Sequence, residues 1–398
     1  MHDTSFLDWP FFEPSHRELA TAVREWAASE IAPSESAEPR GAELDRTCVA
    51  MVRKLGSGGW LHHAIPAAYG GASETIDARS LCVIRETLAS YSGLADFVFA
   101  LQGLGAGPIS LFGSEELKRR YLPRVASGDS IPAFAISEAD AGSDVSAMTT
   151  TARRDGDSYV IDGEKTWISN ASIADFHIVF CRLPAEGARA FIALVVDAGT
   201  AGCSARPLGE ITAPHSIGTL TFRSCRVPAS AVVGTPGKGL SVALGTLDVF
   251  RATVGAAALG IARRALSESL SRATTRRVAG GLMSDAQLTQ ARLAQMATDI
   301  DASALLVYRA AWTRDSGATR VTREAAMAKW FATEAAQRTV DAAVQLHGAM
   351  GVTIGSTVER LYREVRALRI YEGTSEIQQL VIAAQLLATH PRASGGDA

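Results

Sequence analysis

Hydrophobic positions near the N-terminus follow a helical period. In HRELATAVREWAASEIAP, residues 16–33, Leu19, Val23, Trp26 and Ile31 fall on one stripe, and the helix is expected to end before Pro33. The pattern predicts a helical region over residues 15–130.

Between residues 131 and 235 the pattern changes to short runs rich in β-branched and aromatic residues. Four such runs are SYVIDG, DFHIVFCRL, RAFIALVVD and GTLTFRSCRV, and Asp-Gly, Gly-Thr and Pro signals separate them. Runs punctuated in this way are typical of an antiparallel sheet. We therefore predict a small β domain inserted after the first helices.

The helical period returns from GKGLSVALGTLDVF onward. The tetrapeptide from Ser284 to Gln287 has the sequence of a capping box, and the apolar residues that follow it recur at helical spacing. The predicted domains are 1–130, 131–238 and 239–398, which are helical, β and helical. The glycine-rich fingerprint of a doubly wound nicotinamide-binding fold is missing from this order. The tail PRASGGDA is expected to be disordered.

Composition narrows the class of protein. The chain has 398 residues, 47% of them hydrophobic and 20% charged, which is enough to build large buried cores. The net charge of −3, with both signs spread along the chain, predicts no nucleic-acid partner. No apolar run approaches the roughly 18 residues needed to span a bilayer, so we expect no membrane insertion. The N-terminus lacks the pattern of a signal peptide, and we expect a cytoplasmic protein.

The cysteines and histidines point away from metal and disulfide chemistry. Five cysteines without a C-x-x-C pair argue against a disulfide framework and against a zinc site, and we expect buried thiols. The eight histidines show no metal-ligand spacing. We predict no metal site.

Two stretches of the β region carry candidate chemistry. In AFAISEADAGSDVSAM, residues 133–148, Gly142 and Ser143 would let backbone N–H groups approach a phosphate or a flat ring. The alternative is an ordinary turn. In EKTWISNAS, residues 164–172, Trp167 and Ser169 would face the same side of a strand, where they can cover a planar ring and donate to its edge. The alternative is a core tryptophan.

Two further stretches interrupt the C-terminal helices. In QLHGAMGVT, residues 345–353, two glycines indicate either a ligand contact or a helix C-cap. In RIYEGTSEIQQL, residues 369–380, Glu372 stands just ahead of a helix. The structural alternative is a capping box of Ser375 and Gln378, with Glu372 near the positive end of the helix dipole.

Together, SEADAGSD, EKTWISN, QLHGAMG and RIYEGTSEIQ resemble the acyl-CoA dehydrogenase family in order and separation. The resemblance covers nearly the whole chain. It implies an acyl-CoA dehydrogenase-like fold that is mainly α with an inserted β domain: an N-terminal helical domain, a central antiparallel β domain and a C-terminal four-helix bundle. It also implies a homotetramer that binds FAD non-covalently.

The resemblance gives Glu372 a role. It matches the catalytic base that removes the α-proton of an acyl thioester while a hydride leaves the β-carbon for flavin N5. Burial against substrate and flavin would raise the pKa of such a base. In the family, the backbone N–H of this residue and a ribityl hydroxyl of FAD polarise the thioester carbonyl. Gly373 would allow close approach, and a capping function of the following residues is compatible with this role.

The resemblance also implies a set of cofactor contacts. These are Phe134, Ile136, Ser137, Ser143, Trp167, Ser169, Arg276, Gln345, Gly348, Ala349, Thr374 and Glu376, of which Arg276 would reach the FAD of a neighbouring subunit.

The chain departs from the family pattern at several of these positions. Ser137 and Ser169 stand where Thr is frequent, and Ala349 replaces a common Gly. Val278 and Ala279, in RRVAG, replace a polar and an aromatic cofactor contact.

For the substrate, the resemblance implies contacts from Ser143, Asp248, Arg251, Tyr371 and Gly373. Asp248 and Arg251 are equally compatible with a surface helix pair at i,i+3. The walls of the acyl pocket are expected from Phe97, Phe99, Leu101, Phe250 and Tyr371, and the bulky rings among them favour a short, branched or cyclic acyl group.

The predicted function is FAD-dependent α,β-dehydrogenation of an acyl-CoA to a 2-enoyl-CoA, with an electron-transfer flavoprotein as the expected acceptor. The alternatives are an oxidase or flavin monooxygenase of the same fold, a dehydrogenase that acts on an acyl-carrier-protein thioester, and a flavin-free helical binding protein. Retention of Glu372 favours desaturation, because a hydroxylase does not need that base.

Overall fold

The computed structural model describes residues 4–32, 38–187 and 189–390 of the chain. Pro33 and the tail 391–398, which was predicted to be disordered, lie outside the described residues. The chain divides into two compact units, which are described separately below. One unit is Phe12–Phe250, and the other is Arg251–Ala398 together with Met1–Phe11. The predicted boundaries at 130 and 238 stay predictions.

The unit Phe12–Phe250 begins with helices, as the hydrophobic period predicted. They are α1 (Pro14–Glu30), α2 (Gly41–Ser57), α3 (Ala78–Tyr91), α4 (Gly93–Phe112) and α5 (Glu115–Ala126). Three of these helices have side-chain N-caps: Asp77 accepts from the backbone of α3, Ser92 from that of α4 and Ser114 from that of α5. Short polar residues satisfy N–H groups that the first turn of a helix leaves unpaired.

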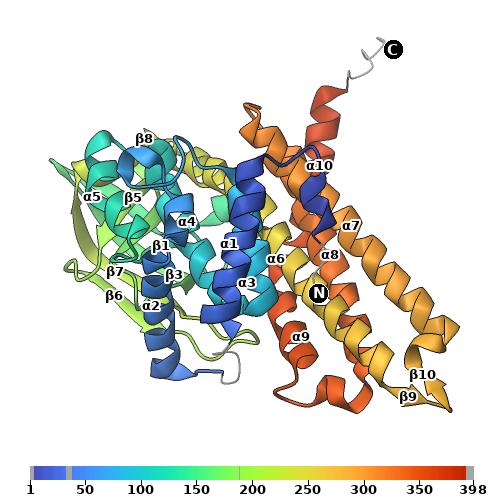
Figure 1. The fold of residues 1–398 in the computed structure, drawn as a ribbon. Helices are drawn as coiled ribbons and strands as arrows, with labels where there is room; N and C mark the ends of the chain where they lie inside the picture. Colours follow the sequence, from blue (N-terminus) through green and yellow to red (C-terminus); the bar gives the residue numbers. More distant parts are fainter. Residues whose placement is uncertain (1–3, 33–37, 188, 391–398) are drawn as a thin grey trace, which may run out of the picture. The chain divides into compact units, whose positions relative to one another are not determined.

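The same unit contains an eight-stranded sheet, drawn in green and yellow-green in Figure 1. Its strands are β1 (Pro132–Ala135), β2 (Thr151–Asp155), β3 (Ser158–Ser169), β4 (Phe176–Arg182), β5 (Phe191–Asp197), β6 (Cys203–Pro207), β7 (Ile217–Pro228) and β8 (Val232–Gly237). They lie in the order β6-β7-β3-β2-β4-β5-β8, and β1 pairs with β4. Each of the four runs identified in the sequence falls in one of these strands.

The predicted antiparallel pairing holds for most of the sheet but is wrong for two pairs that involve β4, in the middle of the strand order. β1 runs parallel to β4, and β2 meets β4 in parallel at the pair Thr151 and Arg182. The chain leaves β1 through a loop and crosses β2 and β3 before it returns, so no hairpin imposes an antiparallel partner on β1. α4 packs against β1 and β4, and nearly every residue of β4 and β5 is buried.

β3 is interrupted by a bulge that the alternating pattern did not predict. Its register against β7 shifts between Lys165 and Ile168, and Lys165 and Thr166 are both buried in succession. Trp167 follows in the left-handed region, with φ of 59°. An extra residue in one strand re-aims the side chains beyond it.

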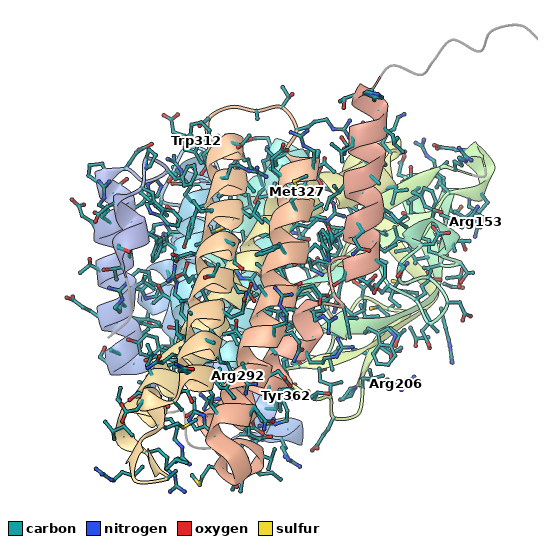
Figure 2. The ribbon with its side chains drawn as sticks, turned by 90° about the vertical axis from the view of Figure 1, so that its right-hand side faces the viewer. Arg153, Arg206, Arg292, Trp312, Met327 and Tyr362 are labelled. Atoms are coloured by element: carbon teal, nitrogen blue, oxygen red, sulfur yellow. The ribbon has the colours of Figure 1, made fainter. Side chains whose placement is uncertain are left out.

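The other unit is built on long helices, labelled in yellow to red in Figure 1. They are α6 (Gly239–Thr275), which enters this unit at Arg251, α7 (Gln287–Asp315), α8 (Thr322–His347), α9 (Thr357–Leu368) and α10 (Ser375–Thr389). α8 is the centre of the unit, because it packs against α7, α9 and α10. In Figure 2, Arg292 and Trp312 mark the two ends of α7.

Two local features of this unit differ from the sequence prediction. Residues of the RRVAG motif form a small hairpin of β9 (Arg277–Val278) and β10 (Gly281–Leu282). The predicted capping box at Ser284 does not form: α7 follows Ala286, which provides no side-chain cap. Ser284 lies inside a 3-10 turn, where the Asp285 carboxylate instead accepts from the backbone N–H of Leu282 at 2.8 Å.

The statement that no apolar run reaches membrane-spanning length was also wrong. Among the described residues, α4 and α6 are long and apolar enough to span a bilayer by length and composition alone. Of their apolar windows, 72% and 78% are buried inside the protein, as in the core helices of globular domains.

The cysteines are free thiols, as predicted. Cys48, Cys82, Cys181 and Cys225 are buried, whereas Cys203 is half-buried because it lies in the edge strand β6. Burial raises the pKa of Cys181 and that of Cys225 to about 12 each, so these thiols are unreactive at neutral pH.

Candidate active site

Glu372 lies in the turn between α9 and α10, and its backbone is left-handed. Its φ is 53° and that of Gly373 is 92°. A non-glycine residue at positive φ costs free energy and persists only where its surroundings hold it. Hydrogen bonds from Tyr371 N to Ala367 O and from Ser375 N to Arg369 O close the turn on either side.

Two fully buried side chains hold the carbonyls of this turn. Gln378 Nε2 donates to Glu372 O at 3.1 Å and to Gly373 O at 3.0 Å. Lys329 Nζ, from α8, donates to Gly373 O at 2.6 Å. These bonds fix the backbone from which the Glu372 side chain projects.

A third residue, Glu334 of α8, fixes the two flanks of the turn. Glu334 Oε1 accepts from Arg369 Nε at 2.8 Å and from Ser375 Oγ at 2.5 Å. Side chains of both α8 and α10 therefore hydrogen-bond to the turn, and the Glu334 carboxylate binds residues on both sides of it.

The predicted capping box of Ser375 and Gln378 was wrong. The N-cap of α10 is Thr374, whose hydroxyl accepts from Ile377 N, and Glu376 follows in the first turn. Ser375 is engaged with Glu334 and Gln378 with the turn carbonyls, so neither is available to cap. The S-x-x-Q pattern does lie at the start of α10, but its Ser and Gln hold the preceding turn and do not cap the helix.

Charges surround Glu372. Burial lowers the pKa of the Lys329 ammonium to about 8, against the opposing influence of Glu372, which is the largest of the acidic contributions, and of Glu334 and Glu376. Arg251 adds to the lowering. Glu372 is half-buried and interacts with the buried Lys329 ammonium, whose charge favours the ionised carboxylate, the form that a base requires.

In the unit Phe12–Phe250 the structure brings together two of the predicted cofactor segments. Thr166 N donates to Ser137 O at 3.0 Å, and Lys165 Nζ donates to Ile136 O at 3.0 Å. The segment after β1, with Ile136 and Ser137, thus lies beside the end of β3. Phe134 packs by its ring on Phe180, with centroids 4.8 Å apart.

The alternative of a core tryptophan at Trp167 is wrong, because its side chain is 56% exposed. The bulge and the positive φ of 59° turn the indole away from the buried side of β3. Ile168, which separates Trp167 from Ser169, is buried, and Ser169 is half-buried. An exposed indole held in a strained backbone beside a hydroxyl fits a planar aromatic cofactor such as the flavin of FAD.

Gly142 and Ser143 lie in an exposed loop before β2. A Cβ added to Gly142 would meet no described atom within 4 Å, so packing within this unit does not require glycine there. That leaves the loop open to a ligand from its solvent side.

Four of the predicted cofactor contacts, of which Arg276 would serve a neighbouring subunit, gather at one end of the helical unit. Arg276 follows α6, and Gln345 and Gly348 end α8; Arg272 joins the two helix ends by donating to His347 O. Arg276, Gln345, Gly348 and Ala349 are all exposed. Gly348 is the C-cap of α8 with φ of 62°, so the C-cap alternative describes its backbone correctly.

The substrate residues divide between the two units. Tyr371 and Gly373 flank Glu372 in its turn. Arg251 is buried, so it is not the surface residue that the alternative reading supposed. Asp248 and Ser143 belong to the other unit.

The residues predicted to wall the acyl end differ in burial. Phe99, Leu101 and Phe250 are buried; a Cβ on Gly103 or Gly107 of α4 would approach the Phe250 ring to 2.7 or 2.9 Å. Phe97 is half-buried and its ring centroid lies 3.7 Å from that of His215.

The sequence analysis missed the residues that hold the site. Lys329 and Glu334 are isolated charges in the alanine-rich stretch AAMAKWFATEAA, and this was the available signal. It also missed a cavity of about 450 Å³ between α7 and α8, lined by Arg292, Met296 and Thr339 among others, which contains none of the predicted site residues.

Three protein-family models match consecutive parts of the chain. They describe the acyl-CoA dehydrogenase N-terminal domain, over residues 13–129, the middle domain, over 133–225, and the C-terminal domain, over 237–387.

Relatives match over nearly their whole length. The chain is 37% identical over 386 residues to a 3-(aryl)acrylate reductase of Clostridium sporogenes, covering 95% of this chain and 100% of the relative. It is 36% identical over 385 residues to the mitochondrial short-chain specific acyl-CoA dehydrogenase of Homo sapiens, covering 94% of this chain and 91% of the relative.

Solved structures agree. A chain in a structure of the electron transferring flavoprotein of Acidaminococcus fermentans matches with a TM-score of 0.89 and 32% identity, over 94% of this chain and 98% of that one. Butyryl-CoA dehydrogenase from Megasphaera elsdenii matches with a TM-score of 0.88 and 29% identity, over 94% and 99%.

Proposed function

Because the chain belongs to the acyl-CoA dehydrogenase family, whose members are FAD-binding oxidoreductases acting on CH–CH groups, we propose that it desaturates an acyl-CoA with Glu372 as the base. The observation that carries the proposal is the turn of Glu372. A carboxylate residue stands there in a left-handed backbone, and buried Gln378 and Lys329 hold the carbonyls beside it. A helix-end charge alone needs no such support.

In the proposed reaction the Glu372 carboxylate takes the proton from the carbon next to the thioester carbonyl. FAD, when bound, supplies the acceptor for the hydride that leaves the β-carbon, at its N5. The backbone N–H of Glu372 polarises the thioester carbonyl, which lowers the pKa of the α-proton. The left-handed backbone sets the direction of that N–H and of the side chain together, so one turn orients both groups.

The other predicted residues complete the proposed site. Trp167 covers the flavin and Ser169 donates to its edge, with Phe134, Ile136 and Ser137 beside them. Ser143, Asp248 and Arg251 contact the thioester and its pantetheine arm. Arg276, Gln345, Gly348, Ala349, Thr374 and Glu376 contact the rest of FAD, with Arg276 serving a neighbouring subunit.

The neighbours also suggest partners. An electron-transfer flavoprotein is the proposed acceptor, since one of the most similar structures comes from such a protein. We propose a homotetramer in the cytoplasm. Light scattering tests the assembly: a monomer that holds its full complement of FAD would contradict the role given to Arg276.

For the acyl group we propose a short or aryl-substituted chain. One relative acts on short-chain acyl-CoAs and another on 3-arylacrylates, by name. A reductase of arylacrylates and a dehydrogenase of acyl-CoAs work on the same kind of carbon–carbon bond in opposite directions. Large buried rings such as that of Phe250 fill the space beside α4, which leaves little room there for a long acyl chain.

The experiment is anaerobic mixing of the FAD-loaded protein with butyryl-CoA, isovaleryl-CoA, 3-phenylpropionyl-CoA and palmitoyl-CoA, with loss of flavin absorbance as the readout. We expect one of the first three to bleach the flavin and palmitoyl-CoA not to. The same acyl groups are also offered as thioesters of an acyl-carrier protein. Comparing the rates of flavin bleaching then shows whether the protein acts on CoA thioesters or on carrier-protein thioesters. Reaction only in the presence of oxygen, without anaerobic bleaching by any thioester, would instead support the oxidase or monooxygenase alternative.

A further inference from the structure

A buried ion pair lies behind the two segments that are proposed to flank the flavin. Lys165 Nζ lies 2.8 Å from Glu138 Oε1, and both side chains are buried. Each residue belongs to a motif identified in the sequence, SEADAGSD or EKTWISN, yet neither is among the predicted cofactor contacts.

The pair joins three separate stretches of chain. Lys165 Nζ also donates to Ile136 O, in the segment after β1, and contacts Met148 Sδ at 3.6 Å. Glu138 accepts from Thr149 N at 2.6 Å, from Thr149 Oγ1 at 2.8 Å and from Thr150 N at 3.0 Å, just before β2. The Glu138 carboxylate therefore accepts hydrogen bonds from an ammonium, a hydroxyl and two backbone N–H groups, and each of these bonds is strengthened by its charge.

The position of the pair matters more than its stability. Lys165 directly precedes the bulge that turns Trp167 outward, and Ile136 directly precedes Ser137. Removing two charges from water is costly, and an apolar pair of similar volume often stabilises a fold as well or better. Buried ionic groups of this kind are best attested where they specify one geometry.

We propose that the Glu138–Lys165 pair is a positioning pair, which sets the Ile136–Ser137 segment against the Trp167–Ser169 segment at the spacing that FAD requires. The inference rests on the assignment of these two segments to FAD under the proposed function. It gives a role to two residues that touch the site only through their neighbours.

The charge states are consistent with this role. Burial by itself raises the pKa of Glu138, but the hydrogen bonds from Lys165, Thr149 and Thr150 outweigh it and hold that pKa at about 2. Burial lowers the pKa of Lys165, opposed by Glu138. The carboxylate remains ionised at every pH at which the protein would be used, so its geometry does not change with pH.

The test measures the affinity of the apoprotein for FAD from the quenching of FAD fluorescence during reconstitution. The reduction potential of the bound flavin is a second readout. The variants are Lys165→Met, the double variant Glu138→Gln with Lys165→Met, and Thr149→Val, a mild change that removes one donor to the carboxylate. Arg226→Met is the matched control, because it breaks the exposed pair Arg226–Asp155 of the same sheet.

We expect Lys165→Met to weaken FAD binding at least about tenfold and Thr149→Val to weaken it a few-fold, as for other supporting residues of a built site. The control should bind FAD as the parent does. In the double variant the unpaired buried charge is gone, so the urea midpoint should recover while FAD affinity stays low. The potential should shift in both variants of Lys165.

Three results would overturn the inference. They are FAD affinity within about twofold of the parent in Lys165→Met and Thr149→Val, a double variant in which affinity recovers together with stability, and an equal loss in Arg226→Met. Because Thr149→Val leaves both charges in place, it keeps the test decisive even if Lys165→Met does not fold. If the unmodified protein takes up no FAD, the proposed function fails. If it takes up FAD and the variants bind FAD as the parent does, only the positioning role fails.

Discussion

At the scale of single residues, the proposed chemistry depends on how the turn of Glu372 is held. Its backbone is strained, and three buried or half-buried side chains, Lys329, Glu334 and Gln378, compensate for the strain through hydrogen bonds to the turn. Supports of this kind matter because a reacting group displaced by about 1 Å can lose about 100-fold in rate.

Gln378→Leu tests the support of the carbonyls. It removes the donors to Glu372 O and Gly373 O but keeps the volume, so we expect a fall in flavin reduction by the substrate of about 10–100-fold and a loss of about 1–3 kcal/mol in the free energy of unfolding. The matched control is Gln379→Leu, because Gln379 is adjacent and exposed. Equal reduction rates in the two variants would show that Gln378 does not position the turn.

Lys329 predicts a pH dependence of stability. The folded protein releases the Lys329 proton near pH 8, whereas an unfolded lysine holds it to about 10.5. Between these values the unfolded state binds more protons, so this group's contribution to the free energy of unfolding rises with pH, by up to about 3 kcal/mol over the full window. Below pH 8 the cost of burying the charge is present in full.

Lys329→Met removes that contribution. The difference in unfolding free energy between parent and variant, measured in urea at about pH 8 and about pH 10, should therefore shift in favour of the parent as pH rises. Taking the difference cancels the titration of the cysteines and tyrosines that both proteins share. A difference that is constant over this window, or that moves in favour of the variant, would mean that Lys329 is not buried as a cation.

At the scale of elements, hydrophobic period located the helices and strands, but the ends of helices were less predictable. Ser284 and Ser375 both begin S-x-x-Q patterns, and neither caps a helix, because nearby groups engage them or displace them from the N-cap position. Local sequence shows which residues are able to cap. It does not show which competing partner lies nearby in the fold.

Replacing Thr374, the N-cap observed in the structure, and Ser284, the cap predicted from the sequence, tests which of the two caps a helix. Thr374→Ala removes the acceptor of Ile377 N and should cost about 1 kcal/mol. Ser284→Ala removes no side-chain cap and should cost less than about 0.5 kcal/mol. Urea unfolding midpoints give both values, and a larger loss in Ser284→Ala would restore the sequence-based assignment.

The β3 bulge shows a second limit at this scale. Alternation predicted that Trp167 and Ser169 share a face of a regular strand, and it gave no sign of the positive φ at Trp167. A bulge depends on register against a partner strand, β7, that lies about 50 residues further along the chain.

At the scale of the whole molecule, the order of helical, β and helical regions followed from periodicity, and the site followed from motifs. The supports of the site did not. The contacts Lys329–Gly373 and Glu138–Lys165 join residues 44 and 27 positions apart, and no local pattern encodes which distant charge a buried group will meet. For Lys329 and Glu334, the signal available from sequence was an isolated charge in an alanine-rich stretch.

The central claim is that Glu372 is the base, and Glu372→Gln tests it most directly because the change keeps size and hydrogen bonding but removes basicity. The measurement is anaerobic stopped-flow reduction of the flavin by the acyl thioester that bleaches the parent protein. The account predicts a rate lower by at least about 10²–10⁴-fold, with FAD and thioester binding retained. Reduction within a few-fold of the parent rate would contradict it and leave Glu372 as a helix-end charge, worth only about 0.3–1 kcal/mol.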